Sequence, residues 1–140
     1  MKVLLAVDGS PYTKRMLAFL AAHDELLSGK NEFTVLTVVP KIPPRAGSFL
    51  TVGDVEGFYR DEAEKVLAPI QTFLAQQGWT VSYRHEAGSP GDVIAAEAAA
   101  GHHDLLVMGS HGHSALGNLV MGSVATRVLA QCTTPVLLVR

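Results

Sequence analysis

A glycine-rich segment, residues 104–126, holds the residues whose types and spacing could do chemistry. Its four leading apolar residues predict a buried strand that breaks at Gly109. Gly112 follows, and after nine more residues Gly122 and Ser123 begin an amphipathic stretch typical of a helix. Backbone N–H groups at a helix N-terminus lack intrahelical partners and carry a positive partial charge, and glycines let a phosphate approach them closely. The segment therefore predicts a phosphate site built from backbone groups.

The spacing Gly-x2-Gly-x9-Gly-Ser, from Gly109 to Ser123 between a strand and a helix, resembles the nucleotide-binding signature of the universal stress protein family, in its ATP-binding, UspA-like branch. Three other segments also resemble that family: LLAVDGS at 4–10, VMGSHG at 107–112 and TPVLLV at 134–139. The resemblance covers nearly the whole chain and implies one universal stress protein domain over residues 1–140. It implies that the protein binds ATP, with Mg²⁺ held mainly by the phosphates and water.

Through this resemblance, a set of residues from three parts of the chain is expected to contact the nucleotide. Asp8, after the first strand, and Val38, at the end of the second, are expected at the adenosine end of the ligand. Asp8 also has a simpler interpretation as a turn residue that helps to cap the first helix. The expected nucleotide-binding residues are Ala6, Val7, Asp8, Val38, Met108, Gly109, Ser110, His111, Gly112, Gly122, Ser123 and Val124.

No catalytic residue and no metal ligand is predicted from the protein itself. Ser114 lies six residues after the expected strand end at Met108, whereas a nucleophile elbow needs a strand directly before its serine. His111 and His113 could orient a water, but no carboxylate or thiol accompanies them as a metal site requires. A P-loop and a dinucleotide fingerprint are also missing from the sequence.

Two further groups of polar residues have simple interpretations. Arg127 is one helical turn after Ser123 and is the cation nearest to the glycine segment. It could contact phosphate, but a solvated helix position is the more common role. The segment His102-His103-Asp104 precedes the strand, at the end of the sheet opposite to the expected site. It is interpreted as a solvated turn.

Strand and helix patterns alternate along the chain. Apolar runs at 3–7, 33–39, 105–108 and 135–139 and an alternating run at 79–86 predict five strands. The order βαβαβαβαβ indicates an α/β protein with a single open, doubly wound parallel five-stranded sheet and helices on both faces. The resemblance implies the strand order 3-2-1-4-5, as in adenine nucleotide alpha hydrolase-like folds. The sequence pattern alone leaves a flavodoxin-like order open.

The helices are expected to differ in length. The first begins at Ser10-Pro11 and keeps helical spacing to Leu27, with Gly29 as its stop signal. Residues 40–54 are rich in proline and glycine and predict a long loop, of the kind that serves as a lid or binding loop or else is disordered. A long helix then spans residues 55–77, where Pro69 should kink it or remove one hydrogen bond.

Composition limits the partners and the compartment. The chain has 140 residues, 48% of them hydrophobic, and its net charge of −2 provides no basic surface for nucleic acid. No apolar run approaches the roughly 20 residues of a membrane span. A single cysteine excludes an internal disulfide and fits a reducing compartment. These features predict a cytoplasmic protein that binds neither nucleic acid nor membrane.

Three functions remain open at this point. The protein could be a binding module whose nucleotide state regulates an unknown client, a slow ATPase using the same pocket, or a nucleotide-free interaction protein. The intact glycine signature favours the first two. A homodimer is also expected through the last strand, Pro135–Val139, which is apolar and lies at a sheet edge in the family's strand order. The family commonly dimerises in this way.

Overall fold

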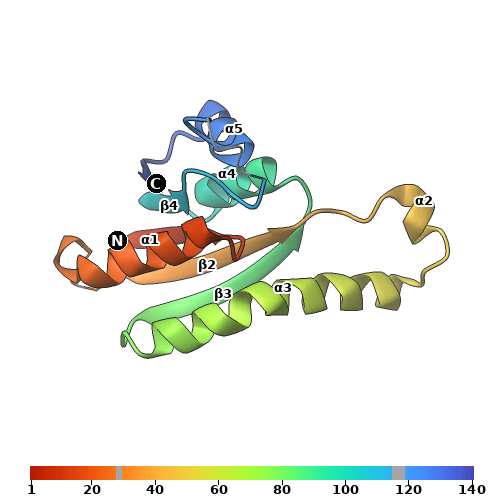
Figure 1. The fold of residues 1–140 in the computed structure, drawn as a ribbon, viewed down its shortest axis with the longest axis horizontal. Coiled ribbons are helices and arrows are strands. Elements are labelled where there is room, and N and C mark those ends of the chain that lie inside the picture. The colour runs from red at the N-terminus through yellow and green to blue at the C-terminus, as the bar shows by residue number, and fades with distance from the viewer. Residues whose placement is uncertain (28–29, 115–118) are drawn as a thin grey trace.

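The computed structural model describes residues 1–27, 30–114 and 119–140. It has strands and helices in alternation, as the sequence predicts (Figure 1). No helix in the described part is long and apolar enough to cross a membrane. The elements are β1 Lys2–Val7, α1 Pro11–Ala22, the 3-10 turn η1 Asp24–Leu26, β2 Glu32–Val39, α2 Pro44–Gly47, α3 Val52–Ala75, β3 Thr80–Ala87, α4 Pro90–Ala100, β4 Leu105–Gly109, α5 Ser123–Gln131 and β5 Val136–Val139.

The five strands form one parallel sheet in the order β3-β2-β1-β4-β5, which confirms the predicted fold class and strand order. β1 lies in the centre, where Val7 pairs with Thr37 of β2 and Ala6 pairs with Met108 of β4. Because parallel strands end at the same edge of a sheet, the residues that follow β1 and β4 lie side by side. Asp8 and Gly109 are therefore neighbours at the carboxyl edge.

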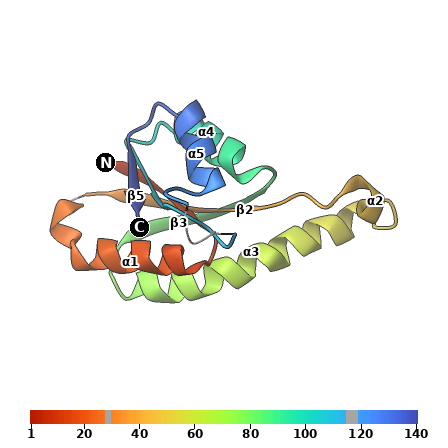
Figure 2. The same ribbon diagram turned by 45° about the horizontal axis from the view of Figure 1, so that its top comes forward.

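Helices cover both faces of the sheet (Figure 2). On one face, α1 and α3 pack over the side chains of Val3, Leu5 and Val7. On the other face, α4 and α5 pack over Leu4 and Ala6. All five of these side chains are buried, and this double burial explains why β1 reads as a continuous apolar run rather than an alternating one.

The first helix is shorter than its sequence pattern predicts. Ser10 caps it as expected, with its hydroxyl 3.5 Å from the N–H of Thr13, and Pro11 is the first helical residue. The helix ends at Ala22, however, and the N–H of His23 closes it on the carbonyl of Phe19 at 3.1 Å. A single 3-10 turn continues to Leu26. The predicted stop signal, Gly29, lies outside the described residues.

The expected loop at 40–54 contains the short helix α2, and α3 begins earlier than residue 55. A capping box sets this start: the Asp54 N–H donates to the Thr51 hydroxyl at 3.1 Å, and the Thr51 N–H donates to the Asp54 carboxylate at 3.0 Å. The hydrogen bonds from Thr51 also lower the pKa of Asp54. Pro69 lies within α3 without ending it. These differences in the bounds of the helices leave the sheet and its carboxyl edge as predicted.

Candidate functional site

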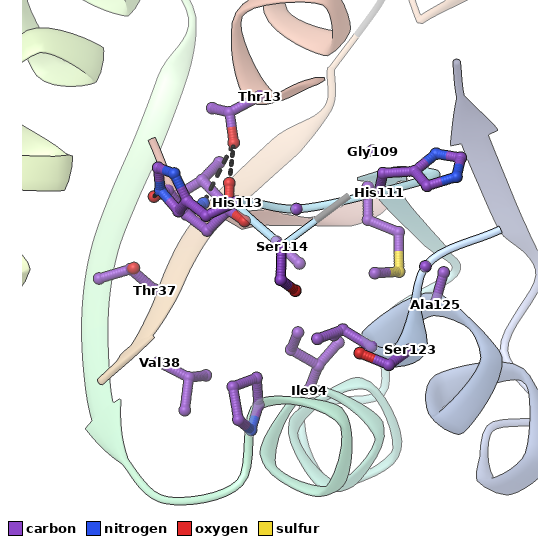
Figure 3. A pocket seen from close by; sticks show the side chains of 18 of the residues that line it. Thr13, Thr37, Val38, Ile94, Gly109, His111, His113, Ser114, Ser123 and Ala125 are labelled. Atoms are coloured by element: carbon purple, nitrogen blue, oxygen red, sulfur yellow. Dashed lines mark hydrogen bonds between the residues drawn. The ribbon is translucent and has the colours of Figure 1, made fainter. Parts of the chain in front are cut away.

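A cavity of about 600 Å³ opens beyond the carboxyl ends of β1, β2 and β4 (Figure 3). This is the edge at which open α/β sheets bind their ligands, and the volume is in the usual range for small-molecule sites. The sides are completed by α3, the N-terminal residues of α4 and α5, and the loop after β4. The lining residues are Ala6, Val7, Asp8, Thr13, Thr37, Val38, Val39, Pro40, Glu62, Val66, Pro90, Ile94, Met108, Gly109, His111, Gly112, His113, Ser114, Leu119, Gly122, Ser123, Val124 and Ala125.

Eleven of the twelve expected nucleotide-binding residues line this cavity. The exception is Ser110, which is buried beneath the loop, with 3% of its surface exposed. The sequence interpretation missed the contributions of α3 and α4, notably Glu62, Val66, Pro90 and Ile94. One signal was available for α4, because a helix that directly follows a parallel strand begins at the carboxyl edge of the sheet. No comparable signal existed for α3.

One half of the cavity is apolar. Val38 and Pro40 line it at the end of β2, and Ile94 lines it near the start of α4, whereas Val66 of α3 lines the cavity beside Gly9 and packs on the other face of the sheet. Figure 3 places Val38 and Ile94 on the same side, away from Gly109 and His111. Such a wall can hold a flat apolar group such as a ring.

The other half of the cavity contains the N-terminus of α5. Its N-cap residue is Gly122, which has no side chain to cap the helix, so the first N–H groups remain available. The Gly122 N–H itself is used, because it donates to the Ser110 carbonyl at 2.7 Å. The next three residues, Ser123, Val124 and Ala125, all line the cavity. This end of the cavity can therefore bind an anion through backbone N–H groups and the helix dipole.

Asp8 has the turn role considered for it and also lines the cavity. Its Oδ1 atom accepts hydrogen bonds from the Ser10 N–H at 2.9 Å and from the Thr13 hydroxyl at 3.0 Å, which confirms a turn role before α1. Its Oδ2 atom has no hydrogen-bond partner within the described residues. A Cβ atom built on Gly112 would lie 2.6 Å from this Oδ2, so the carboxylate lies against the glycine loop.

The signature glycines are required by close packing, whatever ligand binds. A Cβ atom on Gly109 would lie 2.7 Å from Cβ of Tyr12, and one on Gly122 would lie 3.0 Å from Cα of His111. Both distances are tighter than normal van der Waals contact. The glycines let the loop fold back on itself and on α1, so their presence alone does not demonstrate a phosphate.

The two loop histidines point away from each other and form separate hydrogen bonds (Figure 3). His111 Nε2 is 2.8 Å from the Leu119 carbonyl, and His113 Nε2 is 2.6 Å from the Asp8 carbonyl. A carbonyl only accepts, so both Nε2 atoms carry a proton. In the neutral ring His111 Nδ1 then accepts from the Ser110 hydroxyl at 2.9 Å. Both histidines fasten the loop, and within the described residues no group of three or more potential ligands could hold a metal ion.

Arg127 is directed away from the cavity. Its guanidinium donates to the two carboxylate oxygens of Asp92 on α4, at 2.6 and 3.0 Å. Hydrogen bonds from Arg127 and then Gln131 hold the pKa of Asp92 down to about 2. Arg127 thus joins α4 to α5 as an exposed helix residue, in agreement with the simpler of its two interpretations.

The interpretation of His103 as a solvated residue is wrong. Its side chain is 3% exposed, and its Nε2 atom is 3.7 Å from the Glu97 carboxylate. Its Nδ1 atom is buried and has no hydrogen-bond partner in the part of the chain that the structure describes. The turn before β4 folds His103 beneath α4, and His102 adopts a positive φ of 51° to allow it. As expected, this cluster lies at the opposite end of the sheet from the cavity.

Comparison with known proteins gives consistent matches. The sequence model of the universal stress protein family matches residues 1–140. The chain is 30% identical to a universal stress protein of Thermus aquaticus, encoded in the QAH/OAS sulfhydrylase 3' region, across 99% of this chain and 97% of that protein. It also matches longer relatives, and spans 42% of a universal stress protein of Synechocystis at 30% identity.

Solved structures share the fold. The hypothetical protein MJ0577 has a TM-score of 0.83 and 26% identity, with 99% of this chain and 94% of that chain covered. The universal stress protein of Archaeoglobus fulgidus in complex with dAMP has a TM-score of 0.70 and 22% identity, with 100% and 98% covered. A family protein from Arabidopsis thaliana with AMP bound has a TM-score of 0.70 and 18% identity, with 99% and 90% covered.

Proposed function

This chain belongs to the universal stress protein family, and we propose that it is a nucleotide-binding module whose principal ligand is ATP. The observation that carries the proposal is the uncapped N-terminus of α5, which lines one end of a cavity whose other end is apolar. Adenine nucleotides have a matching polarity, with a flat ring at one end and phosphates at the other. The dipole of α5 and the N–H groups at its N-terminus suit the phosphates, and the apolar wall of the cavity suits the ring.

The proposed pose follows from this polarity. Adenine lies against Val38, with the backbone of Ala6 and Val7 beneath it, and Asp8 lies between the ring and the phosphates. The phosphates lie over the glycine loop, where the N–H groups at the start of α5 bind them. The loop residues proposed to surround them are Met108, Gly109, Ser110, His111, Gly112, Gly122, Ser123 and Val124, with Ser110 acting from beneath through its bond to His111.

Structures of related proteins support the choice of an adenine nucleotide. The Archaeoglobus and Arabidopsis proteins hold dAMP and AMP, respectively, and the cavity described above lies at the edge of the sheet where this fold binds ligands. ATP in particular is proposed because the spacing from Gly109 to Ser123 resembles the signature of the ATP-binding branch of the family.

Magnesium would accompany a triphosphate, and the residues present fit a minor role for the protein in holding it. Asp8 is the carboxylate beside the glycine loop, and its Oδ2 atom has no hydrogen-bond partner within the described residues. Mg²⁺ commonly takes one or two carboxylates and completes its shell with phosphate oxygens and water. When bound, the ion would neutralise phosphate charge.

The module is proposed to regulate another protein rather than to catalyse, and to act as a homodimer. No carboxylate is present between Gly109 and Ser123, and the histidines of that loop are engaged in holding it. Backbone N–H groups bind ground and transition states almost equally, which gives affinity without rate. Dimerisation is proposed through the free edge of β5, as argued in the Discussion.

Substitution of Ser123 tests whether the N-terminus of α5 binds the phosphates. Ser123 is the first helical residue of α5, where proline is tolerated because that N–H has no intrahelical partner. Gly122 before it is extended, at φ −74° and ψ 165°, as a residue preceding proline should be. Ser123→Pro therefore removes one phosphate-facing N–H with the helix intact, and Ser123→Ala is the matched control that keeps it.

Isothermal titration calorimetry with Mg-ATP gives the readout. We expect Ser123→Pro to weaken binding by roughly tenfold, the effect of one charge-assisted hydrogen bond, and Ser123→Ala to bind within about threefold of the wild type. Equal affinities for Ser123→Pro and wild type would show that the N-terminus of α5 does not bind the phosphates. No binding of any adenine nucleotide to the wild type would refute the function itself.

A further inference from the structure

Among the described residues, the side chains that line the cavity carry negative charge and no permanent positive charge. Asp8 and Glu62 are the carboxylates among the described lining residues, which include no lysine or arginine. Residues 115–118 cannot add one, because they are Ala, Leu, Gly and Asn. A polyphosphate bound here therefore meets repulsion from side chains, and its attraction comes from the backbone.

The two carboxylates are not equivalent. Glu62 is 2.6 Å from the ammonium group of Lys65, which offsets its charge. Asp8 has no cation within hydrogen-bond distance among the described residues, and its two bonds, from Ser10 and Thr13, both reach Oδ1. Its Oδ2 atom lies against Gly112, inside the loop that would surround the phosphates. Asp8 therefore brings a negative charge, unpaired with any cation among the described residues, to the wall of the cavity beside Gly112.

The groups that could attract a phosphate to the cavity carry little positive charge. The dipole of α5 is equivalent to about half a positive charge at its N-terminus. Arg127, one turn further along α5, is already paired with Asp92. The ring nitrogens of His111 and His113 that form hydrogen bonds hold the loop to Ser110, Leu119 and Asp8. This attraction suits a ligand with one or two negative charges better than a free triphosphate with about four.

We infer that Asp8 determines how much negative charge a ligand can carry and still bind in this cavity. The cavity binds adenine nucleotides of low charge, such as a monophosphate or a cyclic phosphate, without a metal ion. It binds a triphosphate only when a divalent cation reduces the repulsion between Asp8 and the phosphates. This inference rests on the proposed function, because it concerns the same cavity and the same ligand class.

Calorimetry on the full chain tests the inference at about pH 8, where an ordinary histidine is neutral. AMP, cyclic AMP and ATP are each titrated at constant ionic strength, once with EDTA and once with excess Mg²⁺. Mg²⁺ should change the affinity for AMP and cyclic AMP by less than about threefold, but raise that for ATP by roughly thirtyfold or more, since each added charge near Asp8 costs about tenfold.

The variant Asp8→Asn isolates the effect of the Asp8 charge on nucleotide affinity. Asparagine keeps the oxygen that accepts from Ser10 and Thr13, and places an amide where Oδ2 lies. It should raise the affinity for ATP in EDTA by at least about tenfold more than it raises the affinity for AMP, because ATP carries more negative charge. The control Asp54→Asn makes the same change in net charge at the far end of α3, outside the cavity, and should change neither affinity.

Three outcomes would overturn the inference. The first is equal wild-type affinity for ATP with and without Mg²⁺, which needs no variant to observe. The second is a requirement of AMP for Mg²⁺ as strong as that of ATP. The third is an Asp8→Asn variant that loses affinity for both ligands in both conditions, as a simple contact residue would. If no nucleotide binds under either condition, the proposed function fails as well, and that result is distinct from the other three.

Discussion

Arg127 lies one turn into α5, but its guanidinium faces α4 and pairs with Asp92. Phosphoryl transfer needs a positioned water and a charge clamp on the γ-phosphate, usually with a cation. Because Arg127 is engaged elsewhere, turnover should fall well below the typical enzyme value of about 10 per second. Single-turnover hydrolysis of Mg-ATP by wild type, His111→Ala and Arg127→Ala measures this. A wild-type rate above about one per second that falls a hundredfold in either variant would instead indicate an enzyme.

His103 should make the stability of the protein depend on pH. Burial lowers its pKa, while Glu97 at 3.7 Å acts in the opposite direction. Lys2 and Arg84 also face it and add to the lowering. The unfolded chain, with a histidine pKa near 6.5, therefore takes up a proton more readily than the folded one. The contribution of His103 to stability is thus present above about pH 6.5 and is lost as pH falls toward the lowered folded pKa.

Urea unfolding of wild type and His103→Gln at about pH 7.5 and about pH 5.5 checks this prediction. The wild type should lose more stability between the two conditions than His103→Gln does. The control His85→Gln changes an exposed histidine of β3 and should behave as the wild type. Equal losses in wild type and His103→Gln would show that His103 is protonated equally well in both states.

At the scale of elements, α3 divides into two parts with different roles. Its buried residues are Ala63, Leu67, Ile70 and Leu74, all in the second part. The first part, residues 52–62, extends with α2 beyond the sheet (Figures 1 and 2). Phe49, between α2 and α3, and Val52, the first residue of α3, are 91% and 76% exposed. The extension is held as a helix by its capping box and contributes little to the core.

This division predicts different costs for two substitutions in α3. Leu67→Ala should destabilise the protein by about 2–5 kcal/mol, because it opens a cavity against the sheet. Val52→Ser should change stability by no more than about 0.5 kcal/mol, as for an exposed position. Urea denaturation of both variants measures the contrast. A large loss in Val52→Ser would mean that something covers the extension in solution.

The strands and the glycine loop could be predicted because their signals are local. β1 is an unbroken apolar run, and the spacing from Gly109 to Ser123 lies in one segment. The end of α1 and the burial of His103 could not be predicted from the sequence. Both depend on tertiary packing, which a sequence pattern does not display. The same holds for Glu62, which lies far along the chain from the glycine loop that lines the same cavity.

At the scale of the whole molecule, β5 leaves one edge of the sheet open. Among the described residues it pairs with β4 alone, in the register Leu106–Val136 to Gly109–Val139. The Leu106 N–H donates to the Pro135 carbonyl at 2.9 Å. By the alternation of a parallel ladder, the N–H groups of Val136 and Leu138 then point outward. We propose that a second copy satisfies this edge.

Leu138→Pro is the sharpest test of the dimer. Proline on an edge strand is tolerated when its nitrogen faces outward, so it removes the exposed N–H and leaves the pairing with β4. Leu138 also packs against the core beneath α5, and Leu138→Ala reproduces that loss while keeping the N–H. Sedimentation velocity at tens of micromolar should show a dimer for wild type and Leu138→Ala and a monomer for Leu138→Pro. A monomeric wild type would exclude the proposal.

The central claim is that an adenine nucleotide occupies the cavity at the carboxyl edge of the sheet, and thermal unfolding with Mg-ATP tests it most directly. A ligand at a hundred times its Kd stabilises the folded state by roughly 2.7 kcal/mol. For a chain of this size that raises Tm by about 6–10 °C. The account predicts this rise for Mg-ATP and none for Mg²⁺ alone. A Tm that millimolar Mg-ATP and AMP both leave unchanged would contradict it.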